Sequence, residues 1–388
     1  MRMISLGVIV AALQTVAIAD EATVVETHGI EIEVPKGWTF TNRGQIGELV
    51  PTKYKGRAIE IASVKTMPAP TKEAITALLA PEKLDIVRVG QLDRYGLKIV
   101  TVIGKVATKD KGVLDVDIVV LPVGTSATML MSFIRSDQDP MLREANDKLL
   151  LSARVAGQKL SIVVTKPKNT ALMAIPDGFE NGMKVITTGF DGVFRFPRAL
   201  PVKFEECGVI NAFYSPTDHS IRLCHEFFDD TYKLFKKSGM ADDKAMKLTR
   251  GTLGFAFFHE FGHALVGELG LPITGKGEDA ADEIATILLS QAGEAGSEVA
   301  LSGAAWFQTM SAQPGHKSPF WDEHSFNDQR VVSITCLLYG SNPTKYAPVM
   351  KMLKIPDQRL VRCQRDFADR LKAWNLLLEP HMRKATKK

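Results

Sequence analysis

One apolar run that contains three titratable side chains constrains this chain more than any other feature. The run "GFAFFHEFGHALVGELGLP", Gly254–Pro272, has the composition of a buried helix, and its closing Gly and Pro would end that helix. His259, Glu260 and His263 lie inside it. Burying such groups costs free energy unless they are paired or bind a metal ion. The segment therefore predicts a buried helix whose titratable groups meet a partner.

The spacing of the two histidines predicts a zinc site. His259 and His263 are four residues apart, so on a helix they share a face. Neutral imidazole is a common zinc ligand. Glu260 lies beside them, where a carboxylate in an HExxH motif can act as general base toward a water molecule. The alternative is a pair of core histidines that are satisfied by hydrogen bonds around a buried glutamate.

A catalytic zinc ion needs a third protein ligand, and the segment after the HExxH helix offers candidates. We expect Glu278 to be the ligand, because Asp282 follows it at i+4 and could accept the free N–H of a ligating histidine. Glu283 is the alternative third ligand. Asp279 is the remaining acid of this segment. The simpler interpretation of all these acids is that they only stabilise the N-terminus of a helix.

The first twenty residues predict export. The stretch "MRMISLGVIVAALQTVAIAD" has Arg2 before an apolar segment and small residues at Ala17 and Ala19. This pattern is typical of a signal peptide that is cut after Ala19. We therefore expect a periplasmic or secreted protein with no transmembrane segment after cleavage.

The four cysteines fit an exported protein. An even cysteine count is compatible with two disulfides, and four cysteines allow three pairings. Proximity in the sequence favours Cys207–Cys224 and Cys336–Cys363. All four lie in the second half of the chain, which suggests that the two halves are separate domains.

Composition and strand patterns predict two soluble α+β domains. The chain has 388 residues, is 45% hydrophobic and 24% charged, and its net charge of +4 is too small and dispersed to suggest nucleic-acid binding. Residues 20–155 contain alternating strands with short turns and two helical segments, which predicts an antiparallel sheet with flanking helices. Residues 156–388 are mainly helical with a small sheet, and residues 1–19 are the signal peptide.

Three resemblances follow from these patterns. The strand "VPKGWTF" and the helix that leads to "SARV" are similar to PsbP/Mog1-like exported domains, which implies an accessory role for residues 20–155. "HEFGHALV" with the helix of Glu278 and Asp282 resembles the glutamate-zincin metallopeptidases, the thermolysin group, whose usual spacing would select Glu283. The motifs "ECGVINAFYSP", "LPITGKGEDAAD", "DEHSFNDQR" and "VRCQRDF" resemble a family of bacterial exported metallopeptidases known mainly as a domain of unknown function.

The second resemblance implies further site residues. "NAFYSP" is similar to a substrate-binding edge strand of neprilysin, which implies that Asn211 and Ala212 line the cleft. Glutamate-zincins stabilise the oxyanion with a histidine or similar donor, which implies His324 in that role, oriented by Asp322 or Glu323. Arg330 is a second candidate donor.

Taken together, the sequence predicts an exported zinc metallopeptidase, most simply an endopeptidase. It would bind one Zn²⁺ through His259, His263 and Glu278, and would hydrolyse peptide or protein substrates through a zinc-activated water with Glu260 as general base. The alternative is a catalytically inactive, zinc-stabilised periplasmic binding or scaffold protein.

Overall fold

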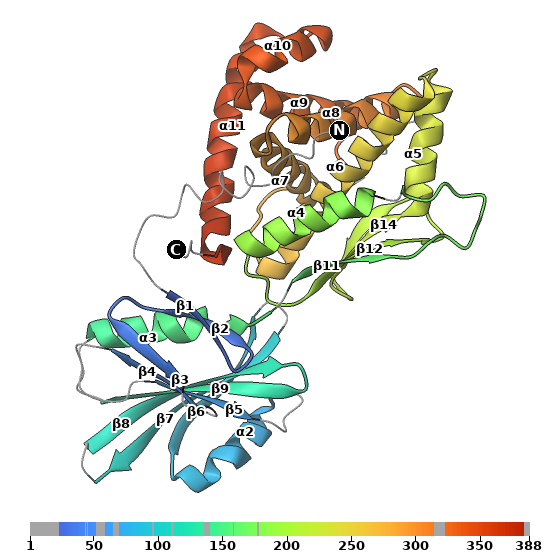
Figure 1. Cartoon of the computed structure of the whole chain (residues 1–388). Helices are drawn as coiled ribbons and strands as arrows, with labels where there is room; N and C mark the ends of the chain where they lie inside the picture. Colours follow the sequence, from blue (N-terminus) through green and yellow to red (C-terminus); the bar gives the residue numbers. More distant parts are fainter. Residues whose placement is uncertain are drawn as a thin grey trace. The chain divides into compact units, whose positions relative to one another are not determined.

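The computed structural model describes most of the chain and divides it into two compact units (Figure 1). One unit lies within Ile18–Gln158 and the other within Lys159–Arg383. The described residues are 23–42, 44, 46–51, 59–64, 70–94, 97–109, 112–135, 140–157, 159–176, 178–313 and 323–383. The predicted signal peptide and Asp322 lie outside them.

The N-terminal unit is built on a seven-stranded antiparallel sheet in the order β3-β4-β5-β9-β8-β7-β6. A smaller sheet, β1-β2-β10, accompanies it. The strands are β1 Thr23–Thr27, β2 Ile30–Val34, β3 Trp38–Asn42, β4 Ile46–Pro51, β5 Ile59–Val64, β6 Asp85–Arg94, β7 Leu97–Thr108, β8 Gly112–Val123, β9 Ser126–Arg135 and β10 Arg154–Val155; the helices are α2 Lys72–Leu79, the 3-10 turn η1 Ala80–Glu82 and α3 Pro140–Ser152.

Each face of the large sheet buries its own apolar cluster, as the strand period of two requires. In strand β8, Leu121 packs in a cluster with Leu149 and Leu150 of helix α3. The neighbouring Val120 packs in a second cluster with Ile75 of helix α2. The helices therefore cover opposite faces of the sheet, which is the α+β arrangement that the alternating pattern predicts.

The C-terminal unit combines a four-stranded sheet with eight α-helices among its described residues. The sheet order is β11-β12-β14-β13, with β13 antiparallel to β14 at one edge. The elements are β11 Leu160–Val164, α4 Phe179–Val193, β12 Leu200–Glu205, β13 Ala212–Ser215, β14 Ser220–Cys224, α5 His225–Lys237, α6 Asp242–Leu269, α7 Gly277–Gln291, α8 Gly293–Ser311, α9 Asn327–Ser341, α10 Pro343–Met352, α11 Asp357–Leu378 and the 3-10 turn η2 Glu379–His381. The mainly helical unit with a small sheet agrees with the predicted fold class.

Helix α6 lies in the core of this unit. Phe257 and Phe261 of α6 are fully buried, and the Phe261 ring stacks on Phe190 of α4 with a centroid distance of 4.4 Å. Burial of two such aromatic side chains contributes several kcal/mol to stability, about 1.5–3 kcal/mol each. The helix ends at Gly270, whose φ of 62° is the left-handed conformation that favours glycine. The apolar residues of the opening run thus anchor the helix that carries the histidines.

The four cysteines lie as two pairs at disulfide distance. Cys207 and Cys224 are bonded with a Cα–Cα distance of 5.5 Å, and Cys336 and Cys363 with one of 5.0 Å. These are the pairs that proximity in the sequence favours. The first joins the segment before β13 to the end of β14, and the second joins α9 to α11. Within the part of the chain that the structure describes, no helix has both the length and the apolar character of a membrane span.

Candidate metal centre

Helix α6 brings the two histidines of the HExxH motif together. His259 Nε2 lies 3.2 Å from His263 Nε2, one helical turn later. His259 is only 6% exposed, so its ring is held in the interior. Two imidazole nitrogens that face each other across one point are the arrangement that the i, i+4 spacing predicts.

A close approach of helix α7 adds one carboxylate, that of Glu278, to this point. A Cβ atom on Gly262 would lie 2.7 Å from Ile284 Cγ2 and 3.1 Å from Ala281 Cα, so only glycine lets α7 pack this closely on α6. The contact brings the first turn of α7 against the histidines. Glu278 Oε2 lies 3.1 Å from His259 Nε2, and Glu278 Oε1 lies 3.3 Å from His263 Nε2.

The separations of these atoms fit a tetrahedral metal ion. Zinc binds imidazole nitrogen and carboxylate oxygen at about 2.0–2.2 Å, so two ligand atoms at corners of a tetrahedron lie roughly 3.3–3.5 Å apart. The two imidazole nitrogens lie 3.2 Å apart, and Glu278 meets them through different oxygens, with Oε2 3.1 Å from His259 Nε2 and Oε1 3.3 Å from His263 Nε2. These separations are close to that value. His259, His263 and Glu278 are therefore a donor set whose chemistry and spacing suit zinc.

Asp282 and Arg330 support this donor set from behind. Asp282 Oδ1 lies 2.8 Å from His259 Nδ1, and the guanidinium of Arg330 donates to both Asp282 oxygens, at 2.6 and 2.7 Å. Arg330 comes from α9 and stacks on the ring of Phe307, with its Cζ 3.9 Å from the centroid. Because Asp282 accepts the Nδ1–H of His259, the Nε2 atom is the one whose lone pair would be available to a metal ion once the ring is neutral.

Electrostatics bind this cluster together. Burial lowers the pKa of His259, but the bonds to Asp282 and Glu278 outweigh it and raise that pKa to about 9. Burial acts to raise the pKa of Glu278, whereas its contacts with His259, His263 and His324 lower it well below its usual range. Burial likewise opposes the ionisation of Asp282, and its bonds to His259 and Arg330 lower the pKa on balance. Without a metal ion, the proton on His259 lies between side chains that could otherwise share a cation.

Glu260 lies on the same helix and faces the edge of the small sheet. The backbone N–H of Tyr214 in β13 donates to Glu260 Oε2 at 2.8 Å, and Glu260 Oε1 lies 4.0 Å from His259 Nε2. The residue is only 8% exposed, and burial raises its pKa. A buried carboxylate with an elevated pKa accepts a proton more readily than an exposed one does.

The remaining predicted site residues occupy distinct places. His324 precedes α9, with a half-exposed side chain whose Nε2 lies 3.0 Å from Glu278 Oε2. The alternative ligand Glu283 faces α11 instead, where it binds Arg370 and accepts from Trp374 Nε1 at 2.9 Å. Asp322 lies outside the described residues. Arg330, considered above as an oxyanion donor, is buried, and its guanidinium donates to Asp282.

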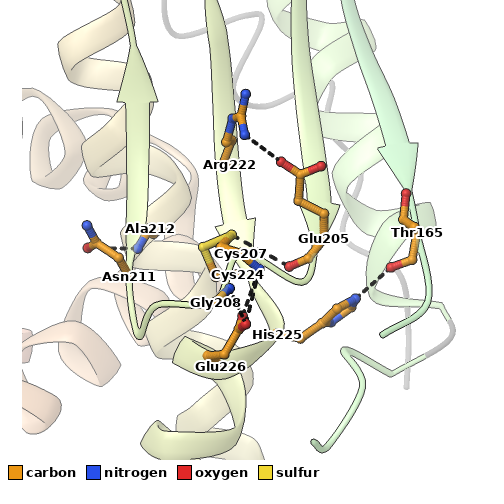
Figure 2. Close-up of a disulfide and its surroundings, with 10 residues drawn as sticks. All are labelled: Thr165, Glu205, Cys207, Gly208, Asn211, Ala212, Arg222, Cys224, His225 and Glu226. Carbon is orange, nitrogen blue, oxygen red and sulfur yellow. Dashed lines mark hydrogen bonds and ion pairs between the residues drawn. A yellow bond between two sulfur atoms is a disulfide. The ribbon is translucent and has the colours of Figure 1, made fainter. Parts of the chain in front are cut away.

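Ala212 begins the edge strand β13, and Asn211 directly precedes it (Figure 2). The Asn211 Oδ1 atom accepts from the backbone N–H of Ala212 at 3.0 Å. The carboxylate of Glu226 accepts the N–H groups of Cys207 and Gly208 just before the strand. Cys207 and Cys224 lie near Glu226 in the geometry of a metal site, but their disulfide leaves no thiolate to bind one. The segment that leads into β13 is thus held by covalent and hydrogen bonds.

Two contacts of the site carried no clear signal in the sequence. Arg330 supports Asp282 across 48 residues, and Tyr214 meets Glu260 across 46. Neither contact follows from helical spacing. The tyrosine lies within the "NAFY" strand, which singled out its neighbours Asn211 and Ala212 only.

Comparison with known proteins assigns the family. The sequence profile of a family described as "Putative metallopeptidase" matches residues 168–378. The chain belongs to this metallopeptidase family. The matched range begins after the N-terminal unit and contains the metal centre of α6 and α7, the edge strand β13 and the supporting helix α9. The family implies a metal and a peptide or protein substrate.

Three solved structures are similar to parts of the chain. Cyanobacterial PsbP from Synechocystis sp. PCC 6803 is 15% identical, covers 36% of this chain and 95% of its own, and has a TM-score of 0.29. LpqN of Mycobacterium tuberculosis, involved in cell envelope biogenesis, is 15% identical over 35% of this chain and 86% of its own, with a TM-score of 0.24. A protein from Bacteroides thetaiotaomicron is 11% identical over 62% of this chain and 78% of its own, with a TM-score of 0.25. No curated protein sequence matches the chain.

Proposed function

We propose that this protein is an exported, zinc-dependent metallopeptidase. The observation that carries the proposal is the convergence of His259, His263 and Glu278, whose donor atoms lie 3.1–3.3 Å apart with a buried glutamate beside them. The family membership supports a peptidase, and the two disulfides support an oxidising compartment outside the cytoplasm.

Each residue has a role that its surroundings support. His259, His263 and Glu278 would hold the zinc ion, which when bound supplies a Lewis acid for a peptide carbonyl and for water. Glu260 takes a proton from the attacking water and returns it to the leaving amine, because it is the buried carboxylate with a raised pKa. Asp282 fixes the tautomer of His259 and is itself held by Arg330.

The substrate would extend along the edge strand. A peptide that pairs with the edge strand β13 would receive main-chain hydrogen bonds, and it would do so regardless of its side chains. Ala212 begins that strand, Asn211 precedes it, and Tyr214 within it contacts the proposed base. His324, half exposed beside Glu278, is the donor that we propose for the developing oxyanion, with Asp322 as its orienting acid.

The experiment compares cleavage by the wild type and Glu260→Gln. Both proteins, zinc-loaded and without the leader, are assayed on casein and on a peptide library. Loss of one general base costs about 10²–10⁴-fold in rate, whereas zinc content should stay the same. The matched control is Glu298→Gln, which changes an exposed glutamate on α8 that pairs with Lys247. Zinc in both proteins with cleavage in neither would favour a zinc-stabilised binding or scaffold protein instead.

A further inference from the structure

Tyr214 contacts helix α6 at two places. Its backbone N–H donates to Glu260 Oε2 at 2.8 Å, and its hydroxyl donates to Glu268 Oε1 at 2.6 Å. The two glutamates are eight residues apart, which is about 12 Å along a helix axis. One residue of the edge strand is therefore fixed both beside the proposed base and two turns further on.

The carboxylate of Glu268 collects three partners although it is buried. Its side chain is 2% exposed, and His219 Nδ1 lies 2.7 Å from the same Oε1 atom that the tyrosine binds. Arg198 Nε forms an ion pair with Oε2 at 3.0 Å. A cation and two hydrogen-bond donors stabilise a buried carboxylate in one position. Loss of these partners would leave an unpaired buried charge, which costs free energy.

The tautomer of His219 follows from this network. Arg198 Nη1 lies 2.6 Å from His219 Nε2, and a guanidinium can only donate. The Nε2 atom therefore accepts, and the proton on Nδ1 is given to Glu268. His219 lies in the turn between β13 and β14 with a φ of 51°, so the network also holds a left-handed turn residue.

Helix α6 carries a glycine where the tyrosine ring crosses it. A Cβ atom at Gly267 would lie 3.0 Å from the Tyr214 hydroxyl and 3.1 Å from its Cε1 atom. An alanine at this position would require the tyrosine ring to shift by a few tenths of an ångström. The glycine therefore leaves room for the ring where its hydroxyl meets Glu268.

We propose that Tyr214, through Glu268, sets the distance between the edge strand β13 and helix α6, and is a positioning residue for extended peptide substrates. The role rests on the proposed peptidase function, because the strand matters to catalysis only if a peptide pairs with it. Without the Tyr214 hydroxyl, the bond from the backbone N–H to Glu260 remains, but β13 loses its second attachment, the bond to Glu268.

The test uses Tyr214→Phe in the full exported chain, with Tyr232→Phe as matched control. The control loses a hydroxyl that contacts a surface carboxylate, Asp242, at 3.4 Å. Hydrogen exchange of the backbone amides of residues 212–221 should quicken about tenfold in Tyr214→Phe and stay unchanged in the control. Gly267→Ala should quicken the same amides, although alanine favours a helix over glycine.

Kinetics separate positioning from a general loss of structure. For Tyr214→Phe, KM for a long peptide should rise about five- to tenfold while kcat and the KM of a short peptide change less than about twofold. Unchanged exchange, or equal losses on long and short peptides, would overturn the proposal. If the wild type cleaves nothing but the exchange result holds, the peptidase function fails and the attachment of β13 through Glu268 stands.

Discussion

His259 Nδ1 lies 2.8 Å from Asp282 Oδ1, and this bond joins helix α6 to helix α7. The Asp282 carboxylate also accepts two hydrogen bonds from Arg330, which lies on a third helix, α9. A buried aspartate between an imidazole and a guanidinium serves one purpose especially well: it fixes which nitrogen of the histidine carries a proton. The orientation of the donor set thus depends on residues that do not touch the metal position.

Asp282→Asn should weaken zinc binding. The amide can still reach Nδ1 but lacks the charge that orients and strengthens the histidine, so affinity should fall about 10–100-fold. Chelator competition measures the affinity, and circular dichroism checks that the variant folds. The control is Asp279→Asn, an acid on the same helix whose side chain accepts from the exposed Ser325. An affinity loss of the same size in the control would contradict the role assigned to Asp282.

Zinc binding should release protons at neutral pH. In the protein without metal, the pKa of His259 is raised to about 9, so the ring carries a proton at pH 7 that a metal must displace. Affinity should therefore rise with pH and level off above about 9. Titration calorimetry in buffers of different ionisation enthalpy counts the protons, with about one expected from His259. Affinity that is constant from about pH 6 to 9 would refute this reading of the cluster.

Gly262→Ala should separate helices α6 and α7. The added methyl group would meet Ile284 at 2.7 Å, so the helices must move apart at the point that brings Glu278 to the histidines. Overpacking of this kind costs about 1–3 kcal/mol in stability, and zinc affinity should fall with it. Urea denaturation and chelator competition measure both quantities.

A glycine-to-alanine change in open space is the matched control for that experiment. Gly182 of helix α4 has nothing within 4 Å of a Cβ position. Gly182→Ala should leave zinc affinity unchanged and stabilise the protein by up to about 1 kcal/mol. Equal behaviour of the two variants would show that the close approach of α6 and α7 does not shape the site.

Removal of the Cys207–Cys224 disulfide should affect both stability and substrate binding. The bond closes 17 residues, and the double serine variant should lose about 3 kcal/mol. KM for peptides should also rise, because the bond holds the segment that begins edge strand β13. The Cys336–Cys363 pair, which closes 27 residues between α9 and α11, is the comparison. Its removal should cost similar stability with little change in KM, and an equal rise in KM would count against the edge-strand account.

The sequence predicted the local geometry of the metal centre better than its surroundings. Helical periodicity alone places His259 and His263 on one face, because the spacing belongs to a single helix. The choice between Glu278 and Glu283 depends on how α7 packs against α6, which Gly262 and the intervening loop decide. Five residues turn a helix by about 140°, so only one of the two acids can face the histidines.

Contacts between residues far apart in the chain could not be predicted from the sequence. Arg330 follows the "DEHSF" motif closely, which suggested a role beside the oxyanion, yet helix packing turns it onto Asp282 and Phe307. The apolar residues of "DIVRVGQLDR", which form strand β6, are spaced too irregularly to predict a strand. The pairing of the cysteines was easier to predict, because joining neighbours in the sequence is the simplest of the three possible pairings.

The most direct test of the central claim is anomalous X-ray scattering at the zinc edge from crystals of the zinc-loaded protein. The account predicts one strong peak per chain, enclosed by His259 Nε2, His263 Nε2 and the Glu278 carboxylate, with Asp282 still bound to His259. A peak at other residues, or fully loaded crystals with no peak between these three side chains, would contradict it.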